Sequence, residues 1–170
     1  PLNKGRPKTL PLTKEDSAKV IELAIGKSLK KYTGEFTKAD LEKVTTLSLF
    51  NKGLTDVKGL EKLTQLTHLN LSNNQLTDVE GLEKLTQLKG LHLGDNQLTD
   101  VPKGLEKLDQ LKKLSLYDNQ LTDVKGLEKL NQLTSLSLEG NKLTDVKGLE
   151  KLTNLERLNL RGNQLTDVKG

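Results

Sequence analysis

The fold is decided by residues 66–87, which read LTHLNLSNNQLTDVEGLEKLTQ. Residues 88–110 repeat this stretch as LKGLHLGDNQLTDVPKGLEKLDQ, with one extra residue at Val101-Pro102-Lys103-Gly104. Equivalent stretches begin at residues 44, 111, 133 and 155, so the period is 22 residues with a single exception of 23. A fixed period of this length indicates a chain built by stacking copies of one small unit.

The apolar residues of each repeat are placed to face one interior. Leu69 and Leu71 flank a polar residue, and this two-residue alternation predicts a short strand with both leucines on one side. Leu76, Val79 and Leu82 bring the chain back over the same side. One repeat cannot bury these side chains alone, so the repeats must stack. Identical rings of leucine nest, which explains 39 Leu among 170 residues and only 2% aromatic residues.

The pattern L-x-x-L-x-L-x-x-N-x-L within this period identifies the unit as a leucine-rich repeat. We expect residues 44–170 to form six repeats, the last one truncated. The predicted fold is an α/β, right-handed solenoid with a short parallel β-sheet on its concave face. Single 3₁₀ or short helical turns are expected on the convex face, where Leu-Glu-Lys-Leu places two leucines inward. The Glu-Lys pairs between them are interpreted as a solvated face of little energetic weight.

Two recurring polar residue types are interpreted as structural. An asparagine ladder is predicted where the chain turns inward, because a carboxamide both donates to and accepts from buried backbone groups. Its members are Asn74, Asn96, Asn119, Asn141 and Asn163, with Lys52 at the same position of the first repeat. Aspartates in the return segment are expected to cap backbone N–H groups, namely Asp78, Asp100, Asp123 and Asp145.

The first quarter of the chain differs from the rest. Residues 13–43 are predicted to be a helical N-terminal cap that covers the open end of the leucine stack. A first helix begins after Thr13, and a second, shorter one begins at Thr37. The apolar stripe of the first helix comprises Ala18, Ile21, Ile25 and Leu29, with Val20 and Leu23 alongside. Residues 1–12 are expected to be an extended or poorly ordered arm, in which Lys4, Arg6 and Lys8 are solvated.

Charge and composition exclude several classes of protein. The net charge of +4 lies entirely in residues 1–43, and the repeats carry equal numbers of basic and acidic residues. A nucleic-acid binder shows a basic stripe on its working surface, so nucleic acid is not an expected partner. No apolar run reaches the roughly 20 residues of a membrane span, so no membrane insertion is expected. The absence of cysteine excludes disulfides and a thiolate zinc site, and no cofactor is expected.

A helical cap followed by coils of Leu-x-Leu-x-x-Asn-x-Leu-Thr-Asp-Val resembles the internalin-type bacterial leucine-rich repeat proteins. In that family a curved solenoid binds host or surface proteins through its concave side. The resemblance therefore implies a protein recognition module without catalysis, exported or placed at the cell surface. The chain ends at Val168-Lys169-Gly170 in mid-repeat, so we expect further repeats or another chain to cover its open end.

Candidate binding residues are the solvent-facing positions of the strands, because the leucines are committed to the core. They are Phe50, His68, His92, Lys113, Tyr117, Glu139, Arg157 and Arg161. Phe50 and Tyr117 are expected to be exposed aromatics, a residue class that often anchors protein interfaces.

Other functions are left open by the same residues. A structural spacer or a consensus-type designed binding scaffold fits the near-identical repeats. His92 and Ser115 are lateral neighbours that could form a nucleophile–base pair, although an open sheet offers no evident oxyanion donors. Asp95 and Asp118 are weak candidates for a shared hard cation.

Overall fold

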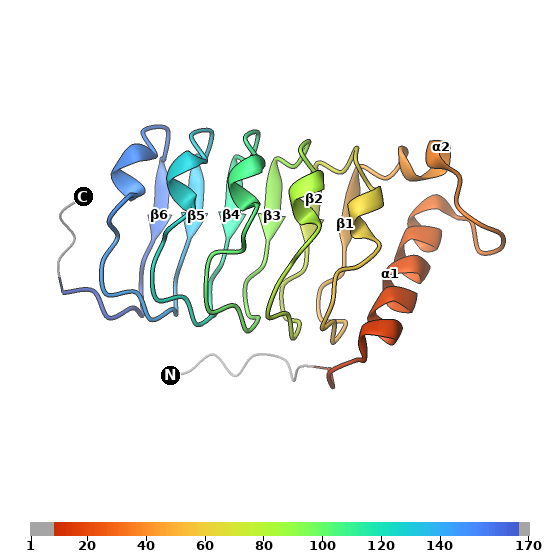
Figure 1. Cartoon of the computed structure of the whole chain (residues 1–170), viewed down its shortest axis with the longest axis horizontal. Coiled ribbons are helices and arrows are strands. Elements are labelled where there is room, and N and C mark those ends of the chain that lie inside the picture. The colour runs from red at the N-terminus through yellow and green to blue at the C-terminus, as the bar shows by residue number, and fades with distance from the viewer. Residues whose placement is uncertain (1–8, 167–170) are drawn as a thin grey trace.

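The structure, a computed structural model, describes residues 9–166. It shows a row of stacked coils with a helical cap at one end (Figure 1). Two helices come first, α1 (Lys14–Leu29) and α2 (Lys38–Leu41). One strand follows in each coil: β1 (Thr46–Ser48), β2 (His68–Asn70), β3 (Gly90–His92), β4 (Lys113–Ser115), β5 (Ser135–Ser137) and β6 (Arg157–Asn159). Five 3₁₀ turns alternate with the strands: η1 (Leu60–Lys62), η2 (Leu82–Lys84), η3 (Leu105–Lys107), η4 (Leu127–Lys129) and η5 (Leu149–Lys151).

The six strands form one parallel sheet in the order β1-β2-β3-β4-β5-β6. Each strand pairs with the next at the spacing of one repeat, as in Leu47 with Leu69 and Leu69 with Leu91. The extra residue near Pro102 does not disturb the sheet, because Leu91 still pairs with Leu114. The fold is therefore the predicted leucine-rich-repeat solenoid, with the sheet on its concave face and the 3₁₀ turns on its convex face.

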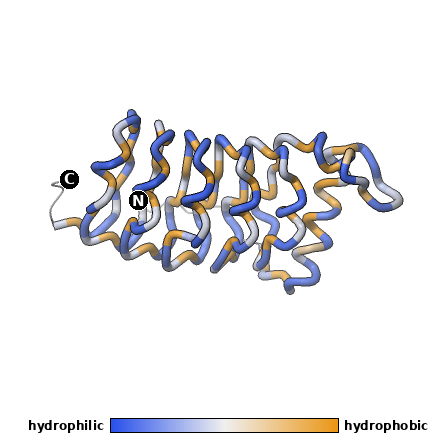
Figure 2. The backbone as a smooth tube through the Cα atoms, turned by 45° about the horizontal axis from the view of Figure 1, so that its top comes forward, coloured by the Kyte–Doolittle hydropathy of each residue, from blue (hydrophilic) through white to orange (hydrophobic). Residues whose placement is uncertain are grey.

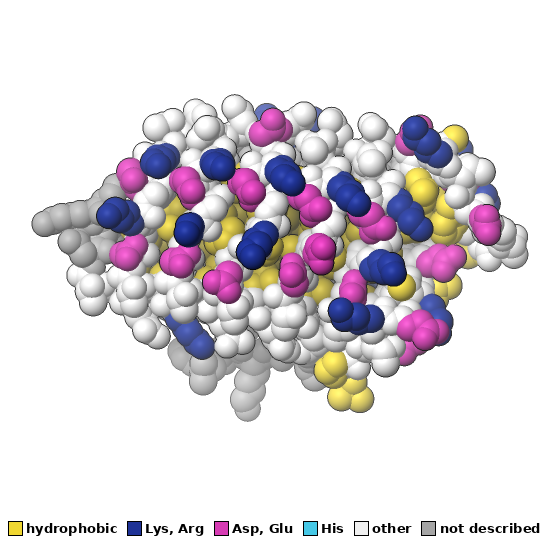
Figure 3. Space-filling model, in the orientation of Figure 1, with side chains coloured by type: hydrophobic (Ala, Val, Ile, Leu, Met, Phe, Trp, Pro, Cys, Tyr) yellow, Lys and Arg dark blue, Asp and Glu magenta, His cyan; other side chains and the backbone are white. Residues whose placement is uncertain are grey.

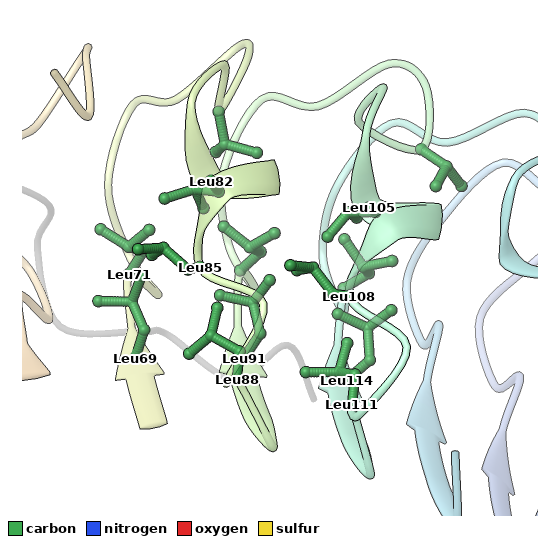
Figure 4. Packing of buried hydrophobic residues seen from close by; sticks show 14 of the residues in the cluster. Leu69, Leu71, Leu82, Leu85, Leu88, Leu91, Leu105, Leu108, Leu111 and Leu114 are labelled. Carbon is green, nitrogen blue, oxygen red and sulfur yellow. The ribbon is translucent and has the colours of Figure 1, made fainter. Parts of the chain in front are cut away.

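The core is a continuous stack of leucines between strands and turns (Figure 4). Leu71, Leu85 and Leu93 are completely buried, and Leu69 is 1% exposed. Apolar positions recur along every coil, separated by polar ones (Figure 2). Because burying a leucine side chain contributes about 1.5–3 kcal/mol, this stack is the main source of the solenoid's stability.

The cap begins where Thr13 accepts a hydrogen bond from the Asp16 N–H at 3.0 Å. Ile21 and Ile25 of α1 join the leucine core. Leu23, expected beside this apolar stripe, is 73% exposed, so that part of the prediction is wrong. The reason is helical geometry: Leu23 lies two residues from both isoleucines, and residues two apart on a helix do not share a face.

The short helix α2 is held by a capping box and an ion pair. The Thr37 side chain accepts from the Asp40 N–H, and the Asp40 carboxylate accepts from the Thr37 N–H. Lys31 Nζ lies 2.8 Å from Asp40 Oδ2. The Lys31 hydrogen bond and the Thr37 N–H hold the pKa of Asp40 far below its usual range.

The described part of the N-terminal arm, residues 9–12, lies against the first coil. The Leu12 N–H donates to the Gly53 carbonyl at 2.8 Å, and the Thr55 hydroxyl donates to the Leu12 carbonyl at 2.9 Å. Lys4, Arg6 and Lys8, expected to be solvated, lie outside the described residues. The arm thus extends the backbone pairing of the coils by one short segment.

The convex turns use their glutamates differently from the expectation. Gly81 has φ 99°, a left-handed conformation, and its N–H donates to Glu83 Oε2 at 2.8 Å. The same bond joins the glycine and the glutamate of each of the other four turns. Lys and acidic side chains still form rows across this face (Figure 3). The interpretation of the Glu-Lys pairs as a merely solvated face is therefore incomplete. Each glutamate accepts a hydrogen bond from the backbone N–H of the glycine that caps its turn, and that glycine has no side chain of its own to form a cap.

The predicted aspartate caps are present in part. The Asp123 and Asp145 carboxylates accept from backbone N–H groups two residues on, at 2.9 and 3.0 Å. Asp78 accepts from the N–H of the next residue, and Asp100 accepts from the Thr99 hydroxyl at 2.8 Å. At the far end, Leu158 of β6 is 43% exposed, because no described coil covers it.

Candidate binding face

A ladder of buried asparagines supports the strand ends from inside. Asn96 Oδ1 accepts from the Leu76 N–H at 3.1 Å, and Asn96 Nδ2 donates to the carbonyls of Leu71 and Leu93 at 3.1 and 3.0 Å. One carboxamide therefore joins two successive coils. Equivalent bonds are made by Asn74, Asn119, Asn141 and Asn163. These inward-facing side chains hold the backbone of successive coils together, and the bonds involve no side chain that points to solvent.

The outward side chains of the strands, and of the residue two positions after the end of each strand, form what we call the concave face. Strand register places them in columns. His68 pairs with Gly90 and then Lys113, and Asn70 pairs with His92 and then Ser115. The predicted binding residues on this face are mostly exposed, with Tyr117 and Glu139 half-buried.

Two glycines of the third coil are covered by rings from its neighbours. A Cβ on Gly90 would lie 2.7 Å from Cδ2 of His68, so the imidazole of the second coil lies over Gly90. A Cβ on Gly94 would overlap Cε1 of Tyr117, so the phenol of the fourth coil lies over Gly94. His92 lies between these glycines in sequence. At the third coil, the surface of the concave face is therefore formed partly by the rings of His68 and Tyr117, which pack over from the neighbouring coils.

Tyr117 is less exposed than the sequence suggested. Its ring rests on Gly94 of the neighbouring coil. Burial raises the pKa of the Tyr117 phenol, and the Asp95 and Asp118 carboxylates add to this rise. Partial burial lowers the pKa of His92, and the neighbouring His68 and Lys113 lower it further.

The predicted residues do not converge on one point. His68, His92, Lys113 and Tyr117 gather around the third coil. The other four predicted residues, Phe50, Glu139, Arg157 and Arg161, lie toward the two ends. From the usual strand spacing, five steps across the sheet span about 24 Å. Glu139 accepts a hydrogen bond from the Asn159 side chain at 2.7 Å, while Phe50 is 38% exposed.

The residue types in the column that contains Asp95 and Asp118 are explained by the backbone conformation there. The residues of this column have positive φ, with 54° at Asp95 and 47° at Asp118; the others are Asn51, Asn73, Gly140 and Gly162. Asparagine, aspartate and glycine adopt this left-handed conformation most readily. Within residues 9–166, no three His, Cys, Asp or Glu side chains are grouped to hold a metal ion. The signal that sequence reasoning missed is the restriction of this column to Asn, Asp and Gly.

The catalytic alternative gains no support from the shape of the face. His92 and Ser115 are in register on β3 and β4, as their spacing suggested. A hollow of about 1050 Å³ lies elsewhere, between α1 and the first 3₁₀ turn, with Ile21, Ile25 and Phe36 in its lining.

In the part of the chain that the structure describes, no helix has both the length and the apolar character needed to cross a bilayer.

Comparison with known families agrees with this architecture. The leucine rich repeat model matches residues 86–143, and a model of two leucine rich repeats matches residues 42–84 and 131–170. The chain belongs to the leucine-rich repeat family. A search of curated proteins gives no match. Members of the family are in general binding modules rather than enzymes, which suits an open sheet.

Solved structures place this leucine-rich repeat protein beside the internalins. An internalin, InlF, from Listeria monocytogenes is 32% identical with a TM-score of 0.83, over 88% of this chain and 44% of that one. The chain thus spans less than half of InlF. Internalin C2 from Listeria monocytogenes is 26% identical with a TM-score of 0.54, over 96% of this chain and 94% of that one. The functional domain of InlJ from Listeria monocytogenes, which includes a cysteine ladder, shares the fold at 23% identity and a TM-score of 0.66, over 82% of this chain and 30% of that one. The internalin-like character inferred from the cap and the coils is confirmed.

Proposed function

We propose that this leucine-rich repeat protein recognises another protein through its concave face and catalyses no reaction. One observation carries the proposal: the inward positions are almost all leucine, whereas the outward strand positions change from coil to coil. The core is the same at every step and needs no variation, so variation on the face is available for choosing a partner. Residues 13–43 act as the cap and residues 44–170 as the binding unit.

The internalin resemblance supports a second part of the proposal, that the protein is exported or held at the cell surface. Its partner is then a protein met outside the cytoplasm. A spacer function would leave the concave face without a partner, and the following experiment separates the two.

A photoreactive residue placed at Ser115, on the concave face, reports contacts there, and one placed at Lys107, on a convex turn, is the matched control. Exposed to extracts of surface proteins, the Ser115 probe is expected to trap a discrete partner that the Lys107 probe does not. Replacing His92, Lys113 and Tyr117 together with alanine should abolish trapping while circular dichroism shows that the repeat fold is retained. Equal trapping by both probes, or unchanged trapping by the triple variant, would refute concave-face recognition.

A further inference from the structure

The third coil and its neighbours carry a more specific site, and the inference drawn from it rests on the proposed function. We propose that His68, His92 and Lys113 form an anion-binding subsite of the concave face. Its ligand is a carboxylate side chain in an acidic segment of the protein partner.

The three side chains share one small patch. His68 and Lys113 stand on either side of Gly90 in the register of β2, β3 and β4. Gly90 presents no side chain between them, and the His68 ring leans over it. His92 projects from the same strand two residues further on, so it lies on the same face. From the usual strand spacing, the patch is about 10 Å across, which suits one or two carboxylates.

Glycine is needed at position 90 for the space that it leaves to the His68 ring, and not for its backbone conformation. The φ of Gly90 lies outside the left-handed region, so an alanine could adopt this backbone. Its added methyl group would instead meet the His68 ring at 2.7 Å. The absence of a side chain therefore leaves room for the imidazole to lie over Gly90.

The charged groups that act on His92 are both basic. The charged neighbours that shift the pKa of His92 are His68 and Lys113, and both lower it. The residues beside His92 in register, Asn70 and Ser115, are neutral. A carboxylate from outside would supply a negative charge and accept hydrogen bonds from imidazolium and ammonium groups.

The acidic residues that follow these strands in the chain act on Tyr117 and not on His92. Asp95 and Asp118 follow the strands at their carboxyl ends, where their charge acts on Tyr117. The face is thus basic at the patch and acidic beyond the strand ends. An acidic segment is drawn to the first region and repelled from the second, which also fixes the orientation in which it lies.

The ligand class sets the direction of the pH dependence. A bound carboxylate favours the charged imidazole of His92, so binding raises the pKa of His92 and takes up a proton. Affinity therefore rises as pH falls through the histidine range, and it falls again once carboxylates protonate near pH ~4.3.

The test is a titration of the full chain with hexaglutamate, followed by backbone amide NMR at pH 6 and pH 8. We expect shifts centred on Gly90, His92 and Lys113, and binding about tenfold tighter at pH 6 than at pH 8, which corresponds to an average uptake of about half a proton across these two pH units. The His68→Gln, His92→Gln double variant should lose the pH dependence. The matched control, Lys107→Gln, removes an exposed basic charge from the convex turn η3 and should bind as the wild type does.

Several results would overturn the subsite. These are equal affinity at the two pH values, shifts centred on Arg157 and Arg161, or a double variant that keeps the pH dependence. Inorganic phosphate serves as a second probe, and binding as tight as that of hexaglutamate would overturn the carboxylate assignment. Failure here is distinct from failure of the proposed function. If the Ser115 probe traps a partner but hexaglutamate does not bind, recognition stands and the acidic subsite falls.

Discussion

Replacing Asn96 with alanine tests whether the asparagine ladder holds successive coils together. The Asn96 side chain makes four hydrogen bonds, accepting from the Leu76 N–H and donating to the carbonyls of Leu71, Leu93 and Gly94. It is 5% exposed, so water cannot take over these bonds. The cost of the substitution depends on which of the four partners keeps another bond.

The three carbonyls keep a partner when Asn96 is removed. Leu71 still accepts from Asn74 Nδ2 at 2.8 Å, and Leu93 still accepts from Asn119 Nδ2 at 3.0 Å. Gly94 still accepts from the Asn73 N–H at 2.9 Å. The Leu76 N–H has its bond to Asn96 alone and is left buried without an acceptor. An orphaned buried donor costs about 1–3 kcal/mol, and the other lost bonds add about 1 kcal/mol, so we expect a loss of about 2–4 kcal/mol.

Urea unfolding followed by circular dichroism measures this loss, and hydrogen exchange locates it at the Leu76 amide. The matched control is Asn163→Ala in the last coil, where the side chain is half-buried and accepts from the Leu143 N–H. Water can reach that site, so its loss should be about 1 kcal/mol or less. If the two variants lose the same stability, or if the Leu76 amide stays protected in Asn96→Ala, the reasoning fails.

Three further substitutions test other contacts. Gly94→Ala displaces the ring of Tyr117, so the raised pKa of this phenol should return toward its ordinary value, as ultraviolet titration of tyrosine measures. The backbone N–H groups of Glu128 and Gly126 lower the pKa of the Glu128 carboxyl, so its contribution to stability is present above the ordinary value of 4.5 and lost as pH falls. Glu128→Gln should therefore unfold at a lower temperature than wild type at pH 7 and converge with it near pH ~3, in thermal melts at several pH values. Leu158→Ala, at a position 43% exposed, should cost well under the ~2–5 kcal/mol of a fully buried leucine in urea unfolding.

Much of the fold could be predicted because the core is periodic. The 22-residue spacing specifies strand register directly: Leu69, Leu91 and Leu114 were expected in one column, and they pair there. Helix starts at Thr13 and Thr37 follow from local capping chemistry. These features depend on short-range sequence or on exact repetition, so one sequence suffices to derive them.

Contacts between unlike side chains of neighbouring coils could not be predicted in the same way. Spacing places Tyr117 and Gly94 in one column, but it does not say that the ring leans over the glycine. The bond from Glu83 to the Gly81 N–H depends on the left-handed φ of that glycine, which leaves the N–H open to a side chain two residues on. Rotamer choice and turn conformation decide both contacts, and neither has a period in the sequence.

The columns of the concave face consequently differ in what they can report about a partner. The column with Asp95 and Asp118 is restricted by its left-handed backbone, so residue identity there is a poor guide to binding. The columns through His68 and His92 have extended strand backbone, which does not restrict the residue type, and only Gly90 is restricted, by the His68 ring above it. Apart from Gly90, the residues of those columns are therefore not fixed by the fold, and a residue such as Lys113 can be exchanged at little cost to the coil. This is why the search for a partner should begin from the histidine columns rather than from the aspartates beside them.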